Sequence, residues 1–239
     1  MTENTVEMNN VTLHFPKQRS ALKMLINRFL RKKDRFTALK NVSLTVKKGE
    51  VLGIIGKNGS GKSTLLRIIS GIYPPDEGNC KVAGSISLLA GLGTGFSGHQ
   101  TGRENAILYG SILGHKEEVM ISKLPEIIDF SELGPFIDEP VRTYSSGMKA
   151  RLGLAVASAI HPDILLIDEV LGVGDPQFKE KSKKRILDLV KSTGTVVLVS
   201  HSFGLMKEIC DRLVFIHKGK IIDVGEPDAI IKLYYENTG

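Results

Sequence analysis

The sequence is short of cysteine and of long hydrophobic runs, and both shortages narrow the class of protein. Its two cysteines, Cys80 and Cys210, lie far apart, so they form neither a disulfide framework nor a metal-binding spacing. We expect both to be reduced and packed in a cytoplasmic protein. The longest apolar run, Leu152 to Ile160, is much shorter than the roughly 18 residues that cross a bilayer. The protein is therefore expected to be soluble, or peripheral to a membrane through a partner.

We also expect no secretory signal, because the first residues include Glu3 and Glu7 and no apolar stretch. The 239 residues are 41% hydrophobic, which is enough for a substantial core. The composition indicates one large domain, or one domain with an inserted lobe.

Net positive charge is concentrated in one segment, and the rest of the chain is close to neutral. The formal net charge is +6, yet residues 17–35 alone hold eight lysines or arginines against one aspartate. A protein that binds nucleic acid more often spreads its charge along a groove. The pattern therefore indicates a local docking surface and no nucleic-acid partner.

The most informative motif is the run from Gly56 to Thr64, which has the pattern G-x-x-x-x-G-K-[ST] and is called the phosphate loop below. In such a loop, backbone N–H groups curl round the phosphates of a nucleoside triphosphate, the lysine neutralises them, and the hydroxyl that follows can ligate Mg²⁺. Residues 51–55 are predicted to form a buried strand, and residues 63–70 a helix whose N-terminus faces the anion. The predicted nucleotide-binding residues are Gly56, Asn58, Gly59, Ser60, Gly61, Lys62, Ser63 and Thr64.

Strands are predicted before this motif over residues 6–15 and 38–46, the second from apolar residues that alternate at a period of two. Residues 20–33 differ, because apolar side chains recur there at i, i+3, i+4, i+7 and i+8 among cations. They predict a short basic amphipathic helix with Ser20 as its N-cap. The apolar stripe packs either on the protein's own β-lobe or on a membrane partner, and it consists of Leu22, Leu25, Ile26, Phe29 and Leu30.

Beyond the phosphate loop, a turn at residues 74–78 precedes two short strands that end at Ala90, and a glycine-rich loop that is expected to be mobile follows over 91–102. Residues 103–160 are predicted to be mostly helical. The breaks in this helical stretch are predicted at Gly114, Pro125, Pro135 and Pro140.

The last third of the sequence returns to alternating elements, which implies an α/β fold with helices on a parallel sheet and an inserted helical lobe over about 103–160. The predicted elements are a strand at 164–167, a helix at 177–191, a strand at 195–199, a helix at 203–209 and a hairpin of strands at 213–216 and 220–224.

Two carboxylates, Asp168 and Glu169, end the predicted strand at 164–167. In a phosphate-loop enzyme, an aspartate at this place serves the metal ion and a glutamate polarises the attacking water. A strand followed by acidic residues is also common elsewhere, so the assignment depends on the surrounding motifs.

A further motif, Tyr144-Ser145-Ser146-Gly147-Met148, opens a helix predicted to run to Ile160. Small residues at the positive end of a helix suit a second contact with the triphosphate, although alone they indicate only a helix cap. The order of the motifs favours a contact with the triphosphate over a plain helix cap. The motifs follow one another as the phosphate loop, this helix start, the carboxylate strand, Asp175, and Ser200-His201-Ser202 at the end of another strand.

Over essentially its whole length, the sequence resembles the nucleotide-binding subunits of ABC transporters. By this resemblance, residues 56–64 are the Walker A loop, 144–148 the signature motif, 164–169 Walker B, Asp175 the D-loop aspartate and His201 the switch histidine. The resemblance implies a P-loop NTPase fold in a single nucleotide-binding domain over residues 1–239. Its parts would be a mostly parallel sheet, an antiparallel β-lobe and an inserted helical subdomain.

The resemblance also implies ATP and Mg²⁺ as cofactors, with Ser63 and Asp168 on the metal and with Glu169 and His201 as catalytic residues. It implies head-to-tail homodimers in which one subunit's phosphate loop and the other's signature motif sandwich ATP. Phe15 matches the aromatic position that stacks on adenine, although a phenylalanine in an edge strand is more often part of the core. The signature residues expected at the nucleotide are Ser145, Ser146 and Gly147.

Three stretches resemble more narrowly the ATPase subunits that export lipid-linked polysaccharides, such as O-antigen, capsule and wall teichoic acid. They are residues 143–152, 95–105 and 170–175. That group also carries an amphipathic element between its first two strands, near the membrane and the channel entrance, which residues 20–33 match.

The sequence departs from the wider family at two motifs. The position of the usual Q-loop glutamine falls near Gly91 or Leu92, and Gln100 lies too close to Thr101 to replace it. In the signature motif, Ser146 and Met148 stand where the family usually has glycine and glutamine, which the exporter group tolerates.

We therefore predict the ATPase subunit of an ABC exporter for a lipid-linked polysaccharide, peripheral on the cytoplasmic face of the inner membrane. A separate membrane-spanning permease dimer would handle the polymer. One alternative is an ABC exporter for a small molecule or lipid, and another is a soluble ABC ATPase that acts on ribosomes or DNA. The signature and the basic helix favour the polymer, and 239 residues do not fit the tandem domains or long coiled coils of the soluble class.

Overall fold

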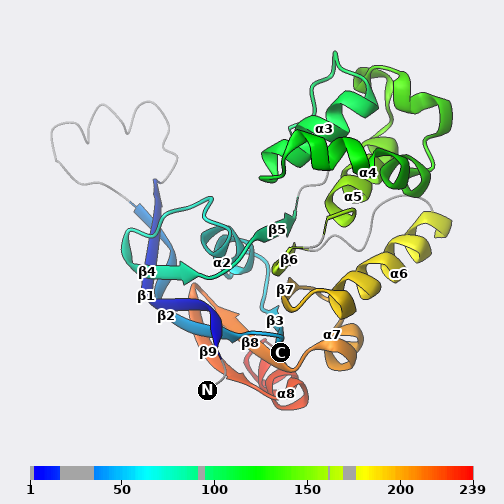
Figure 1. Ribbon diagram of the computed structural model, residues 1–239. Helices are drawn as coiled ribbons and strands as arrows, with labels where there is room; N and C mark the ends of the chain where they lie inside the picture. The colour runs from blue at the N-terminus through cyan, green and yellow to red at the C-terminus, as the bar shows by residue number, and fades with distance from the viewer. Residues whose placement is uncertain (1–2, 17–34, 91–94, 161, 169–175, 239) are drawn as a thin grey trace, which may run out of the picture. The chain divides into compact units, whose positions relative to one another are not determined.

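The computed structural model of the protein describes residues 3–16, 35–90, 95–160, 162–168 and 176–238 (Figure 1). The chain divides into two compact units. The first comprises residues 1–47, 52–83 and 202–239, and the second comprises residues 48–51 and 84–201. The amphipathic helix predicted at residues 20–33 lies outside the described residues and stays a prediction.

The first unit contains an antiparallel sheet with the strand order β2-β1-β4. In β2, Val42, Leu44 and Val46 are buried while the residues between them are exposed, which confirms the predicted alternation. Because β4 pairs with the other side of β1, β1 is the central strand, and the expectation that Phe15 lies in an edge strand is wrong. The strands are β1 (Asn4–Pro16), β2 (Arg35–Lys47) and β4 (Glu77–Val82).

The same unit contains all but the first residue of β3 (Val51–Ile55), which pairs in parallel with β8 (Arg212–His217). β8 continues through a hairpin into β9 (Lys220–Gly225), as predicted. Lys218 and Gly219 in the turn have φ angles of 47° and 76°. Two successive residues with positive φ are typical of the tight turn that matches the twist of a hairpin. The segment His217-Lys218-Gly219 is called the β8–β9 turn below.

Three described helices belong to the first unit, and one of them was not predicted. α2 (Lys62–Ile69) and α7 (Phe203–Ile209) agree with the predictions, whereas α8 (Pro227–Thr238) was missed. Pro227 is the first residue of α8 and Asp228 lies in its first turn, and both are preferred at a helix start. These residues could have identified the helix from the sequence.

The second unit contains three parallel strands in the order β5-β6-β7. All five residues of β7 are buried, as are the first four of β6, which explains why both segments are continuous apolar runs. α6 belongs to the same unit and follows β6 in the chain. The bounds are β5 (Ile86–Leu89), β6 (Ile164–Asp168), β7 (Thr195–Val199) and α6 (Pro176–Ser192).

Between β5 and β6, the chain forms the predicted inserted lobe of helices, which cluster together in Figure 1. Gly114 separates the first two helices, as predicted, and Pro140 separates two short 3₁₀ helices. The helix after the signature motif ends at Ser158 rather than at Ile160. This helical lobe consists of α3 (Gly102–Ile112), α4 (Glu117–Ser131), η1 (Gly134–Asp138), η2 (Val141–Thr143) and α5 (Ser146–Ser158).

The break predicted at Pro125 is wrong, because α4 runs through it without interruption. A proline inside a helix removes a hydrogen-bond donor and costs about 3 kcal/mol. Here Pro125 is exposed, while Met120, Leu124 and Ile127 are buried in the helical lobe, where α4 contacts α3 and α5. Burial contributes roughly 1.5–3 kcal/mol for each large apolar side chain, which offsets the cost of the proline.

The described part of the glycine-rich loop, residues 95–101, is held by the buried side chain of Asn105. The Asn105 amide nitrogen lies 2.9 Å from the Ser97 carbonyl oxygen, 3.1 Å from that of Gln100 and 2.9 Å from that of Thr101. Its amide oxygen accepts a hydrogen bond of 2.7 Å from the Ser97 N–H. These hydrogen bonds restrain the described part of the loop, and the mobility expected of the loop stays a prediction.

Replacing Asn105 with alanine should lower the free energy of unfolding by about 2 kcal/mol. The reason is that the substitution leaves partly buried backbone groups without their hydrogen-bond partner. Urea denaturation would measure the loss. The matched control is Asn237→Ala, which removes an exposed side-chain hydrogen bond on α8 and should change stability by less than about 0.5 kcal/mol. Equal effects of the two substitutions would contradict the role of Asn105.

Candidate functional site

The phosphate loop joins the carboxyl end of β3 to the start of α2, as the sequence predicted. β3 is almost entirely buried beside β8, so the loop begins from a rigid strand. α2 begins at Lys62, with Gly61 as its N-cap, so the backbone N–H groups of the first turn lie next to the loop. Parallel strands of α/β proteins bind ligands at this end.

Gly61 adopts a conformation that other residues rarely take, with a φ of 112°. A Cβ atom there would lie 2.8 Å from Leu39 Cδ2 and 3.0 Å from the Ala38 carbonyl oxygen. Gly59 also has a positive φ, of 76°, but faces open space. The loop therefore packs closely on β2 at Gly61 and leaves room for a ligand at Gly59.

Lys62 places a buried positive charge across the phosphate loop. Its ammonium group donates hydrogen bonds to the carbonyl oxygens of Gly56, at 2.8 Å, and Lys57, at 3.2 Å. Only 6% of the residue is exposed. A cation held in a low-dielectric setting interacts strongly with an incoming phosphate.

The remaining groups of the loop also suit an anion. The N-cap Gly61 supplies no side-chain hydrogen bond to α2, and the first turn holds no acidic residue, while Ser63 and Thr64 lie there half-buried. The Ser60 hydroxyl is buried without a hydrogen-bond partner in the described part of the chain. A buried polar atom of this kind is normally satisfied, so the loop fits a phosphate ligand.

A magnesium ion that accompanies a nucleotide needs only one or two protein oxygens, because phosphates and water fill the other positions. The described residues contain no group of three or more histidine, cysteine, aspartate or glutamate side chains that could hold a metal without such help. Ser63 in the first unit and Asp168 in the second offer oxygen ligands of the kind that Mg²⁺ prefers. The donor chemistry therefore fits the ion.

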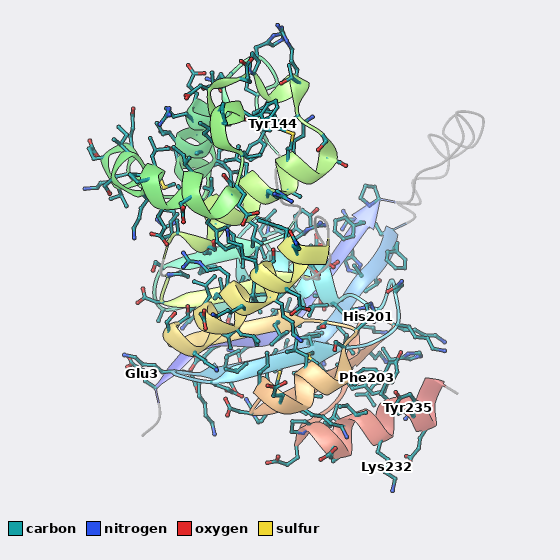
Figure 2. The ribbon with its side chains drawn as sticks, turned by 90° about the vertical axis from the view of Figure 1, so that its right-hand side faces the viewer. Glu3, Tyr144, His201, Phe203, Lys232 and Tyr235 are labelled. Atoms are coloured by element: carbon teal, nitrogen blue, oxygen red, sulfur yellow. The ribbon has the colours of Figure 1, made fainter. Side chains whose placement is uncertain are left out.

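Asp168 and His201 lie at the same end of the sheet in the second unit. Asp168 is the last residue of β6 and pairs with Val199, the last residue of β7, and Ser200 and His201 follow directly. His201 is exposed (Figure 2). Glu169 and Asp175, as well as the Q-loop position at Gly91 or Leu92, lie outside the described residues.

The signature motif forms the exposed start of α5. The Ser145 hydroxyl accepts a hydrogen bond of 3.2 Å from the Met148 N–H and so caps the helix. Ser145 and Ser146 are exposed, and a Cβ atom at Gly147 would meet only the Ser145 hydroxyl, at 3.7 Å. The motif therefore presents small side chains and a positive helix end to solvent.

Tyr144, the first residue of the signature motif, is buried in the helical lobe (Figure 2). Its hydroxyl donates a hydrogen bond to the Phe136 carbonyl oxygen. A Cβ atom at Gly102 would lie 2.2 Å from this hydroxyl, so the tyrosine fits only against a glycine. Burial, and then the negative charges of Asp138 and Glu139, raise the pKa of Tyr144, which keeps the hydroxyl protonated. This anchor was not predicted, because nothing near Tyr144 in the sequence indicates the residues that its side chain contacts.

Phe15 lies on β1 of the antiparallel sheet, next to β2, the strand that contacts the phosphate loop. It pairs with Phe36 on β2, and its ring meets that of Tyr73 edge to face with centroids 5.4 Å apart. Ala38 and Leu39, which contact Gly61, follow Phe36 on β2. This placement suits a base next to the phosphates, and stacking on adenine stays a prediction.

Comparison with known proteins gives consistent matches. Residues 39–172 match the family described as ABC transporter. The chain is 49% identical over 200 residues to an O-antigen export system ATP-binding protein of Myxococcus xanthus, covering 84% of this chain and 46% of the relative. It is 47% identical over 213 residues to a teichoic acids export ATP-binding protein of Enterococcus faecalis, with coverages of 89% and 47%.

A third relative, an O-antigen export system ATP-binding protein of Klebsiella pneumoniae, is 40% identical over 240 residues, with coverages of 97% and 98%. The chain thus spans about half the length of the first two relatives and nearly all of the third.

Solved structures share the fold. An ATP-binding subunit of an ABC transporter superposes with a TM-score of 0.74 at 21% identity, covering 98% of this chain and 95% of the other. An ATP-binding cassette dimer bound to ADP and phosphate gives 0.72 at 24% identity, with coverages of 93% and 98%. These likenesses confirm the predicted fold class.

Lys62→Ala should weaken the binding of ATP and ADP by about tenfold to a hundredfold, because charge-assisted hydrogen bonds contribute roughly 1.5–3 kcal/mol. His201→Ala should leave ADP affinity within about twofold of wild type, because the predicted contact of His201 is with the γ-phosphate that ADP lacks. Calorimetry with both nucleotides would measure the constants, and Lys191→Ala, which removes an exposed lysine on α6, is the matched control. An equal loss of ADP affinity in the His201 and Lys62 variants would exclude the assignment of His201 to the γ-phosphate.

Proposed function

Because this chain belongs to the ABC transporter family, we propose that it is the ATP-binding and ATP-hydrolysing subunit of an exporter for a lipid-linked polysaccharide. The observation that carries the proposal is the arrangement of the phosphate loop. There the ammonium group of the buried Lys62, at the start of α2, donates hydrogen bonds to the carbonyl oxygens of Gly56 and Lys57. The names of these relatives, which refer to O-antigen and teichoic acid export, support the polymer as cargo.

In the proposed reaction, Lys62 and the backbone N–H groups of the phosphate loop bind the phosphates, and Phe15 stacks on the adenine. Ser63 and Asp168 would hold Mg²⁺, which when bound neutralises charge on the phosphates. Glu169 accepts a proton from the attacking water, and His201 contacts the γ-phosphate. Lys62 and Phe15 thus serve nucleotide binding, whereas Glu169 and His201 serve hydrolysis. Substitutions in the second pair should therefore slow hydrolysis without weakening binding.

The exposed start of α5 supports a proposed head-to-tail homodimer. Ser145, Ser146 and Gly147 leave the positive end of the helix open to solvent, which suits the triphosphate held by a second subunit. Asp175 would act at the same interface. ATP binding would close the sandwich and hydrolysis would reopen it.

The proposed partner in the membrane is a separate permease dimer that handles the polymer. Among the described residues, no helix is long and apolar enough to cross a bilayer. We place the subunit on the cytoplasmic face of the inner membrane, where the basic segment at residues 20–33 would meet the permease or anionic lipid headgroups.

Glu169→Gln should preserve ATP binding but lower the rate of hydrolysis by 10²- to 10⁴-fold, because it removes the proton acceptor and leaves the phosphate loop intact. Single-turnover hydrolysis by the purified transporter would measure the rate, and size-exclusion chromatography should show an ATP-bound dimer. The matched control Glu236→Gln changes an exposed glutamate on α8. Hydrolysis by the Glu169 variant within about twofold of wild type would reject Glu169 as the base.

Charge reversal at Arg28, Arg31, Lys32 and Lys33 should lower polymer export while leaving ATP binding unchanged, because these cations flank the apolar stripe without belonging to it. Export would be measured in cells that lack their own exporter ATPase but express its permease and make its polymer. The control reverses four exposed lysines elsewhere, Lys183, Lys184, Lys191 and Lys232. Normal export by a stable quadruple variant would remove the docking role, and no export by the wild-type chain with any polysaccharide permease would contradict the proposed cargo.

A further inference from the structure

The β8–β9 turn, far from the phosphate loop in the sequence, is hydrogen-bonded to it. The Gly219 N–H donates a hydrogen bond of 2.8 Å to the Ser60 carbonyl oxygen inside the loop. The Gly219 carbonyl oxygen accepts a hydrogen bond of 2.8 Å from the Lys40 N–H on β2. One glycine therefore connects the loop to the antiparallel sheet through backbone groups alone.

Only glycine fits at this position. Its φ is 76°, and a Cβ atom would lie 2.5 Å from the Ala38 carbonyl oxygen and 3.3 Å from Leu39 Cα. These are backbone atoms of a paired strand, so they cannot move aside cheaply. A larger residue would push the β8–β9 turn away from β2 and would draw its N–H away from Ser60.

Each end of the loop packs on a backbone segment next to Gly219. A Cβ atom at Gly56 would lie 2.3 Å from the Ile216 carbonyl oxygen, just before the β8–β9 turn. At the other end, Gly61 packs on Ala38 and Leu39, the β2 residues that Gly219 also touches. The hydrogen bond to Ser60 lies between these two contacts in the chain.

This hydrogen bond orients a peptide group that the ligand needs. The peptide bond between Ser60 and Gly61 is planar and trans, so its C=O and N–H point in opposite directions. Because the Ser60 carbonyl points at Gly219, the Gly61 N–H points away from the β8–β9 turn. Backbone N–H groups in such loops bind the phosphates.

We propose that Gly219 is a positioning residue for the nucleotide phosphates, which it orients through the Ser60–Gly61 peptide without touching the nucleotide itself. The inference rests on the proposed binding of ATP and adds a residue that none of the nucleotide-binding motifs contains. It assigns the role to the backbone of the β8–β9 turn rather than to a side chain.

Gly219→Ala should weaken ATP and ADP binding at least about tenfold, equivalent to about 1.4 kcal/mol, and should raise KM for ATP more than it lowers kcat. Two controls should stay within about twofold of wild type. Gly225→Ala introduces a methyl group at the far end of β9, where it would meet only Ile230, at 3.6 Å. Lys218→Ala removes the exposed side chain of the turn and keeps its backbone. Wild-type affinity in a folded Gly219→Ala protein would overturn the proposal.

A measurement on the unsubstituted protein does not depend on how the variant folds. Hydrogen exchange should find the Gly219 amide protected in the nucleotide-free protein and at least about tenfold more protected with ADP bound, because the ligand closes the loop around the same peptide. Exchange at the rate of a free turn amide, or a rate that ADP leaves unchanged, would refute the role.

The two proposals fail in different ways. If the wild-type chain binds ATP and Lys62→Ala weakens binding while Gly219→Ala leaves it unchanged, the inference about Gly219 is wrong and the proposed function stands. If the wild-type chain binds neither ATP nor ADP, the proposed function is wrong.

Discussion

Backbone contact between the phosphate loop and its neighbours is the constraint on which the first unit depends. The loop follows β3, which is buried beside β8, and two of its glycines, Gly56 and Gly61, approach carbonyl oxygens on β8 and β2 too closely for a side chain. The pair of β3 and β8 and the β2 strand of the antiparallel sheet must therefore all be in place before the loop has its shape. The antiparallel sheet, which carries no phosphate ligand of its own, is needed because β2 forms one wall of the loop.

The second unit relies on charged side chains to attach its helical lobe to α6. Glu132 accepts hydrogen bonds from Arg151 on α5, at 3.4 Å, and from Lys181 on α6, at 2.6 Å. The Arg151 guanidinium also lies over the Phe178 ring, 4.6 Å from its centroid. Each exposed ion pair contributes little alone, but the ring contact adds roughly 0.5–1 kcal/mol and fixes the direction of Arg151. The start of α5 is thereby tied to the helix that follows Asp175 in the chain.

A second pair reinforces this attachment, because Arg185 on α6 hydrogen-bonds Glu126 on α4 and, at 2.8 Å, the Ser158 carbonyl oxygen at the end of α5. Partial burial would raise the pKa of Glu126, but hydrogen bonds from Arg185 and Lys123 outweigh it and hold the pKa below its usual value. Glu126 therefore stays charged at neutral pH, and one arginine joins three helices.

The sequence predicted the elements whose signal is local. β3, β7 and α7 were predicted with their observed bounds, because apolar runs there end abruptly at glycine or polar residues. The predictions failed where contacts between residues distant in the sequence determine the structure. Pro125 is tolerated because the other face of α4 is buried, and the central place of β1 depends on β4, about sixty residues later in the chain. Within the site, the pattern of the phosphate loop identified Lys62, whereas nothing local to Gly219 or Tyr144 indicates the residues they contact.

The contact between Tyr144 and Gly102 has a consequence for how this chain could diverge. The phenolic oxygen occupies the volume that a side chain at position 102 would need. The residue that fits at position 102 therefore depends on position 144, although the two are more than forty residues apart in the sequence. A descendant that acquired alanine at 102 would have to shorten residue 144 in the same lineage. Position 102 therefore stays restricted to glycine for as long as position 144 holds tyrosine.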